Sequence, residues 1–209
     1  MSHSRPLLYD RALLAIDLEM SGLNPKTDRI LSLGCVPITQ DGIPLGQAQH
    51  WLFRCPESVA QSATIHHLRD CDLHNGGADP EQVLPELLQR LKGHVLVTHG
   101  GDIDADFLNQ AHLRYWGQRW RPTRMDTQDF ARRRLGSEHL PTANNLSLRH
   151  CRQHYHLPAW RAHHALSDAI ATAELFQAQL QDAFPEQDNP QWRSVHKSFS
   201  NLWMRLGIR

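Results

Sequence analysis

An acidic pair at the end of an apolar run is the feature of this sequence that most constrains its fold. Residues 13–16 are all apolar and predict a buried strand, and Asp17 and Glu19 follow at alternate positions. Alternate residues of a strand face the same side of a sheet, so the two carboxylates should point toward one spot. Like charges held that close resist ionisation unless a cation lies between them. The pair therefore indicates a site for a hard divalent metal.

Two further acidic segments make this interpretation more specific. Residues 99–108 follow a second apolar run and lead into a helical pattern, which places Asp104 near a strand-to-helix junction. Residues 163–176 carry apolar side chains at helical spacing, with Asp168 close beside the buried stripe. A charge in that position needs a partner, because burial opposes the ionised form.

In order and spacing, the three segments resemble the three motifs of the DEDDh branch of the DnaQ-like 3′-to-5′ exonucleases. This group includes the proofreading subunit of bacterial DNA polymerase III, RNase T and oligoribonuclease. The residues that carry the resemblance are Asp17, Glu19, Asp104, Phe107, Leu108, His163 and Asp168. The match extends from about residue 13 to residue 180. It implies an α/β, RNase H-like fold with a mixed central sheet flanked by helices.

The resemblance also implies a role for each of these positions. The four carboxylates, Asp17, Glu19, Asp104 and Asp168, would hold two divalent ions, Mg²⁺ or Mn²⁺. His163 would take the proton from the attacking water, which suits an imidazole with a reference pKa of about 6.5. The implied activity is metal-dependent 3′-to-5′ hydrolysis of single-stranded nucleic acid ends to nucleoside 5′-monophosphates, with DNA favoured and RNA left open.

The expected substrate contacts follow from the same resemblance. The residues that match the family's pocket for the 3′-terminal nucleotide are Met20, Ser21, Leu23, Ile65 and His66. Leu23 would provide an apolar surface against the terminal base. Inward packing of Leu23 as a turn residue is the alternative.

Spacing decides between neighbouring candidates in the second and third motifs. Asp102 and Asp106 compete with Asp104, and the distance to the apolar pair that follows favours Asp104. His164 competes with His163, and the distance to the helix carboxylate favours His163.

Two rival functions remain. Residues 17–25 are locally similar to oligoribonuclease, which favours an exoribonuclease of the oligoribonuclease or RNase T kind. A non-catalytic nucleic-acid-binding relative ranks last, because all four carboxylates and the histidine are present. Gly100 stands where the family usually has Asn. That difference removes no metal-ligand position, but it bears on rate and substrate preference.

Composition restricts the partners and the location. The chain has 22 basic and 22 acidic residues, so a large duplex-wrapping surface is not expected, whereas single-stranded DNA or RNA 3′ ends need less positive charge. Histidines gather between residues 150 and 164, either on a solvated face or on a positive rim beside the site. No apolar stretch is long enough for a membrane, and the four cysteines lack metal spacing, which predicts a cytoplasmic protein with reduced thiols. A polymerase partner and a homodimer are left open.

The pattern of elements predicts one domain at residues 1–184, which the resemblance implies is an exonuclease domain, and a helical tail at 185–209 that packs on the domain or on a partner. Strands are expected at 13–16, 30–38 and 51–53, paired as an antiparallel meander, and a fourth at 95–98. Helices are expected at 80–91, 104–116, 126–135, 146–154 and 165–180, with a last one in the tail.

Overall fold

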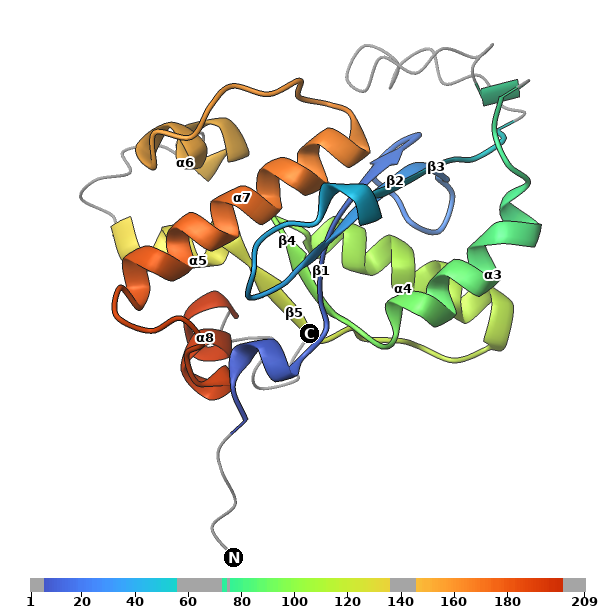
Figure 1. Cartoon of the computed structure of the whole chain (residues 1–209). Coiled ribbons are helices and arrows are strands. Elements are labelled where there is room, and N and C mark those ends of the chain that lie inside the picture. The colour runs from blue at the N-terminus through green and yellow to red at the C-terminus, as the bar shows by residue number, and fades with distance from the viewer. Residues whose placement is uncertain (1–5, 56–72, 75, 136–145, 201–209) are drawn as a thin grey trace, which may run out of the picture.

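The computed structural model describes residues 6–55, 73–74, 76–135 and 146–200. Its centre is a five-stranded sheet with strand order β3-β2-β1-β4-β5, covered by helices on both faces (Figure 1). The strands are β1 (Leu13–Met20), β2 (Ile30–Ile38), β3 (Gln49–Leu52), β4 (Val95–Thr98) and β5 (Arg124–Asp126). The helices are α3 (Pro80–Leu91), α4 (Asp102–Trp116), α5 (Thr127–Leu135), α6 (Leu148–His154), α7 (Ala165–Ala183) and α8 (Trp192–Phe199), with short 3-10 turns η1 (Leu8–Asp10) and η2 (Leu45–Gln47).

The sheet is mixed, as expected. Strands β1, β2 and β3 pair antiparallel, which confirms the meander, and β4 and β5 continue the sheet parallel to β1. Strand β5 was not expected. It has three residues, too few for an alternating pattern, and the helix predicted from residue 126 begins one residue later, because Asp126 ends the strand. Residues 51–53 were expected as a strand, and β3 instead runs from Gln49 to Leu52.

The alternation along β1 divides the core into two halves. Leu13 and Ala15 join the half formed with α5, α7 and α8. Leu14 and Ile16 join the half formed with α3 and α4. Because Asp17 and Glu19 continue the alternation of Leu13 and Ala15, they face α7 rather than α3. The hydrophobic pattern of one strand thus decides which helix meets the two carboxylates.

Helix α7 crosses β1 and β2 at close range (Figure 1). Gly34 of β2 is the cross-strand neighbour of Asp17. A Cβ atom on Gly34 would lie 2.2 Å from the backbone nitrogen of Leu166 and 2.3 Å from the backbone carbonyl carbon of Ala165. The missing side chain at Gly34 therefore lets the first turn of α7 rest on the sheet, which brings Asp168 beside Asp17.

We expect Gly34→Ala to destabilise the protein by about 1–3 kcal/mol or more, because the added methyl group overlaps backbone atoms that cannot rotate away. Urea unfolding followed by circular dichroism would measure the change. The matched control is Gly46→Ala, since a Cβ there would meet nothing within 4 Å. Equal stability of the two variants would contradict the close-packing role of Gly34.

Helix α8 belongs to the core of the described chain. Its residues Val195 and Phe199 are fully buried, and the Phe199 ring stacks on Phe130 of α5 at a centroid distance of 4.5 Å. The helix predicted in the tail is therefore present as α8, and it packs on the rest of the described chain. Residues 201–209 lie outside the described residues, and the division of the chain at residue 184 stays a prediction.

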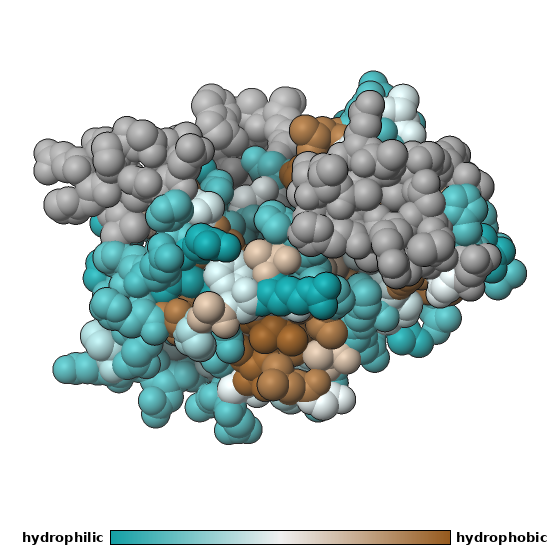
Figure 2. All heavy atoms as spheres, turned by 90° about the horizontal axis from the view of Figure 1, so that it is seen from above, coloured by the Kyte–Doolittle hydropathy of each residue, from teal (hydrophilic) through white to brown (hydrophobic). Residues whose placement is uncertain are grey.

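Where Figure 2 colours the surface by hydropathy, most of it is hydrophilic, with a hydrophobic patch near the lower centre of the view. Among the described residues, the large hydrophobic side chains that remain exposed are Leu7, Leu23 and Leu45. None of the described helices combines the length and the apolar character needed to cross a membrane. The homodimer and the cytoplasmic location stay predictions.

Candidate active site

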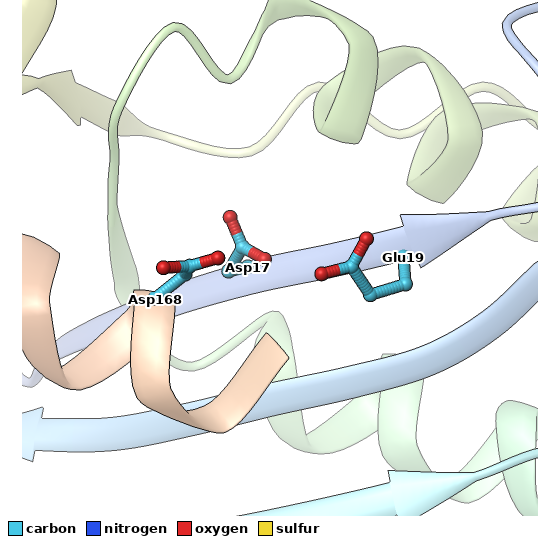
Figure 3. A group of neighbouring side chains, drawn as sticks. All are labelled: Asp17, Glu19 and Asp168. Atoms are coloured by element: carbon cyan, nitrogen blue, oxygen red, sulfur yellow. The ribbon is translucent and has the colours of Figure 1, made fainter. Parts of the chain in front are cut away.

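The acidic residues of the first and third motifs meet at the junction of β1 and α7. Asp17 and Glu19 project from β1, and Asp168 projects from the first turn of α7 (Figure 3). One carboxylate oxygen from each of the three lies within 4.8 Å of the others. Three anionic groups at this separation repel one another, and a cation with oxygen ligands would remove the repulsion. The three side chains, called the carboxylate cluster below, therefore have the chemistry of a divalent-cation site.

The electrostatics of the carboxylate cluster agree with this interpretation. Burial, and then the charges of Asp104, Asp168 and Glu19, raise the pKa of Asp17 well above its ordinary value. Burial and the charges of Asp168 and Asp104 raise the pKa of Glu19 to about 7. In the absence of a cation, the site thus resists carrying its full negative charge near neutral pH.

Asp104 lies close to the carboxylate cluster but is not one of its three members. It is buried in the first turn of α4, with 6% of its surface exposed, and it is close enough for its charge to raise the pKa of both Asp17 and Glu19. Burial raises the pKa of Asp104 itself to about 7, which the charge of Arg124 partly offsets. Asp102 is exposed and pairs with Arg124 instead, which favours Asp104 over Asp102 for the predicted role.

The unexpected strand β5 fixes the loop that leads into α4. The Asp126 carboxylate accepts hydrogen bonds from the backbone N–H groups of Gly100 and Gly101, each at 2.9 Å. Arg124, which lies on β5 together with Asp126, donates to the Gly101 carbonyl and to the Asp102 carboxylate. These two side chains hold the start of α4, and therefore Asp104, in place. No periodic signal marks such a short strand, because three residues are too few to show an alternating pattern.

The structure gives a physical reason why glycine can replace asparagine at position 100. Gly100 has a φ of +66°, in the left-handed region that glycine and asparagine tolerate better than other residues. A Cβ there would lie 3.1 Å from the side-chain amide nitrogen of Gln128. The backbone path therefore suits both residues, and Gln128 occupies the neighbouring space.

The two histidines of the third motif lie in different surroundings. The His163 backbone N–H donates to Asp168 Oδ2 at 2.8 Å, so the residue adjoins the carboxylate cluster. The His164 ring instead caps α7, because its Nδ1 accepts from the Ser167 backbone N–H at 3.4 Å, and its centroid lies 4.7 Å from that of His50. These contacts engage the His164 ring at the start of α7, and the role of His163 in proton transfer stays a prediction.

A family model described as exonuclease matches residues 14–176. The chain belongs to this exonuclease family. The PolC-type DNA polymerase III of Thermotoga petrophila is 30% identical over 178 residues, which cover 82% of this chain and 12% of that protein. The DNA polymerase III subunit epsilon of Aquifex aeolicus is 26% identical over 175 residues, which cover 82% of each protein.

Solved structures support the fold of this exonuclease-family chain. Exonuclease I superposes with a TM-score of 0.69 at 14% identity, covering 90% of this chain and 42% of that one. Exonuclease X, solved in complex with 5′-overhanging duplex DNA, gives 0.62 at 19% identity, covering 89% and 98%. The expected RNase H-like exonuclease fold is confirmed. The chain spans only 12% of the length of the PolC-type relatives from both Thermotoga species.

The residues predicted to contact the substrate differ in burial and in the contacts that they make. Leu23 is 79% exposed, so it does not pack inward as the alternative proposed. Met20 is partly buried against the core half that contains α3 and α4. The Ser21 backbone N–H donates to the Arg29 carbonyl at 3.0 Å, which closes the hairpin between β1 and β2. Ile65 and His66 lie outside the described residues.

We expect Glu19→Gln to stabilise the cation-free protein more at pH 8 than at pH 5. The folded-state pKa of Glu19, about 7, lies above its unfolded value of about 4.3, so the folded protein holds the extra proton between these values. The unfolding free energy that Glu19 contributes therefore falls as pH rises through this window. Thermal melting of both proteins in EDTA from pH 5 to pH 8 would measure the difference. Both proteins contain His99, whose pKa is lowered by burial, so its contribution to the unfolding free energy rises with pH. Taking the difference between the two proteins removes this contribution. A constant difference would contradict the prediction.

Proposed function

We propose that this chain is a divalent-cation-dependent 3′-to-5′ exonuclease that removes nucleoside 5′-monophosphates one at a time from single-stranded ends, with DNA favoured over RNA. The carboxylate cluster carries the proposal: Asp17, Glu19 and Asp168 come from two separate elements, yet place oxygen atoms within 4.8 Å of one another. Folding a chain to this arrangement costs electrostatic free energy, which a bound cation would recover.

The donor set fits Mg²⁺ or Mn²⁺, because both prefer oxygen ligands and leave positions for water and phosphate. Asp17, Glu19 and Asp168 would hold the ions, with Asp104 as the fourth carboxylate, and the raised pKa values of Glu19 and Asp104 support this assignment. Two bound ions would neutralise the phosphate, lower the pKa of the attacking water and stabilise the leaving 3′-oxygen.

His163 would accept the proton of the attacking water. Its backbone contact with Asp168 supports this role, because it holds the residue next to the carboxylate cluster. His163 is exposed, so a proton that it takes from the attacking water would pass on to solvent.

Leu23 would stack against the terminal base from the loop that follows β1. Its side chain is 79% exposed, and base stacking on an apolar surface would cover it. Such contacts are worth about 1–3 kcal/mol per base and tolerate any sequence. The nucleotide whose base stacks on Leu23 would be the last one of the substrate and would carry the free 3′-hydroxyl group.

The comparisons support DNA as the favoured substrate and a polymerase as a partner to test. The relatives in Thermotoga petrophila and Aquifex aeolicus are named as DNA polymerase III proteins. E. coli exonuclease I has been solved with a dT13 oligonucleotide bound. The equal numbers of acidic and basic residues suit an enzyme that grips a few terminal nucleotides.

The test is a degradation assay with Mg²⁺ on single-stranded DNA, single-stranded RNA and dinucleotides, each labelled at the 5′ end. We expect a ladder of products that shortens from the 3′ end, nucleoside 5′-monophosphates in the supernatant, and faster turnover of DNA. A 3′-phosphate should block the reaction, because it adds charge and bulk where the site closes. Preferred turnover of dinucleotides or RNA would instead establish the exoribonuclease alternative. Efficient cutting of a circular single strand would show that the protein is not an exonuclease.

A further inference from the structure

The segment between α6 and α7 holds Asp168 from both sides. The Trp160 indole N–H donates to Asp168 Oδ1, and the His163 backbone N–H donates to Asp168 Oδ2 at 2.8 Å. Both donors are uncharged and come from the same short connection. An ionised carboxylate has about four lone-pair sites, so these two bonds leave room for a cation on each oxygen.

Trp160 is itself held in place by a buried arginine. The guanidinium carbon of Arg152 lies 4.9 Å from the centre of the Trp160 ring, and Arg152 is only 1% exposed. Arg152 donates to the Ala171 carbonyl of α7 at 2.7 Å and to the Pro158 carbonyl at 2.8 Å. It also pairs with Glu174 of α7 at 2.7 Å. The arginine therefore fastens the connecting segment to the same helix that carries Asp168.

The His163 backbone conformation agrees with this arrangement. His163 has a φ of +62°, which is uncommon for a residue with a side chain. In this conformation its N–H points at Asp168. Surrounding contacts must maintain such a conformation, and the fastening of residues 158–160 by Arg152 is one of them.

We propose that Trp160 is a positioning residue for Asp168: Arg152, itself paired with Glu174, holds the Trp160 ring, and the indole N–H fixes the carboxylate in the orientation that meets the divalent cation. Donors to the far side of a ligating carboxylate set its direction, and losing them typically weakens metal binding about 10- to 100-fold. This inference rests on the cation site of the proposed function and adds a residue to it. Trp160 lies outside the three motifs.

The test compares Trp160→Phe with Trp192→Phe. Phenylalanine keeps an aromatic ring beneath Arg152 but removes the N–H donor together with part of the indole volume, and a second Trp→Phe change controls for the lost volume. Trp192 is a matched control, because Arg11 lies over its ring at 5.6 Å and the ring belongs to the α8 side of the core. Mn²⁺ affinity is measured by isothermal titration calorimetry on the full chain without substrate. We expect Trp160→Phe to bind Mn²⁺ about 10- to 100-fold more weakly than the wild-type protein, and Trp192→Phe to bind normally.

A second measurement tests the contact without relying on a metal. In a ¹⁵N-labelled sample, the Trp160 indole resonance, identified by its loss in Trp160→Phe, should move in Asp168→Ala, while the Trp192 resonance stays in place. Wild-type Mn²⁺ affinity in Trp160→Phe, or an unmoved Trp160 resonance in Asp168→Ala, would overturn this inference alone. A wild-type protein that binds no Mn²⁺ would overturn the proposed function and this inference with it.

Discussion

Replacing Asp17 with asparagine should reduce hydrolysis of a 5′-labelled single strand by about a thousandfold or more. Asp17 is the member of the carboxylate cluster whose pKa is raised by all three of the other acidic residues, so it lies at the electrostatic centre of the site. Losing a ligand there would remove several kcal/mol of transition-state stabilisation, and each 1.36 kcal/mol is about tenfold in rate. Single-turnover assays in Mg²⁺ would measure the loss.

The fold should survive this substitution. An amide at position 17 removes one of several mutually repelling charges, so the melting temperature of the cation-free protein should stay the same or rise. Asp41→Asn, a change in an exposed turn after β2, is the matched control and should leave both rate and melting temperature unchanged. Near-normal turnover by Asp17→Asn in Mg²⁺ would refute the two-metal mechanism.

The parts of the site that could be predicted from sequence lie on regular elements. The apolar alternation along β1 places Asp17 and Glu19 on one face, and the helical period of α7 places Asp168 one turn into a helix that packs there. In both cases the same hydrophobic pattern that builds the core also fixes the direction of the acidic side chain. Local periodicity is therefore enough to find these residues.

Other parts of the site depend on contacts between distant residues, which periodicity cannot show. Strand β5 is too short for a pattern, yet Arg124 and Asp126 hold the start of α4. The close approach of α7 to the sheet depends on the absence of a side chain at Gly34. Trp160 donates to Asp168 from an irregular segment, and its ring lies against the buried Arg152. In each case the determining partner lies elsewhere in the chain, so the local sequence contains no signal for it.

The choice of His163 over His164, which the spacing to Asp168 favours in the sequence and which the cap contact of His164 supports in the structure, leads to the second large expected effect. We expect His163→Asn to reduce the rate by about a hundredfold or more, with much less effect on Mn²⁺ binding, because the variant loses the proton acceptor but keeps the carboxylates. Asparagine is chosen because it tolerates the left-handed backbone of His163, which has a φ of +62°. The backbone N–H that donates to Asp168 is therefore retained.

The matched control is His164→Asn. His164 is the N-cap residue of α7, and asparagine is among the preferred residues at that position, so the helix start should be preserved. Its rate should stay within a few-fold of the wild-type rate in the same single-turnover assay. If His164→Asn were inactive and His163→Asn active, the proton acceptor would be His164, and the assignment of the third motif would be off by one residue.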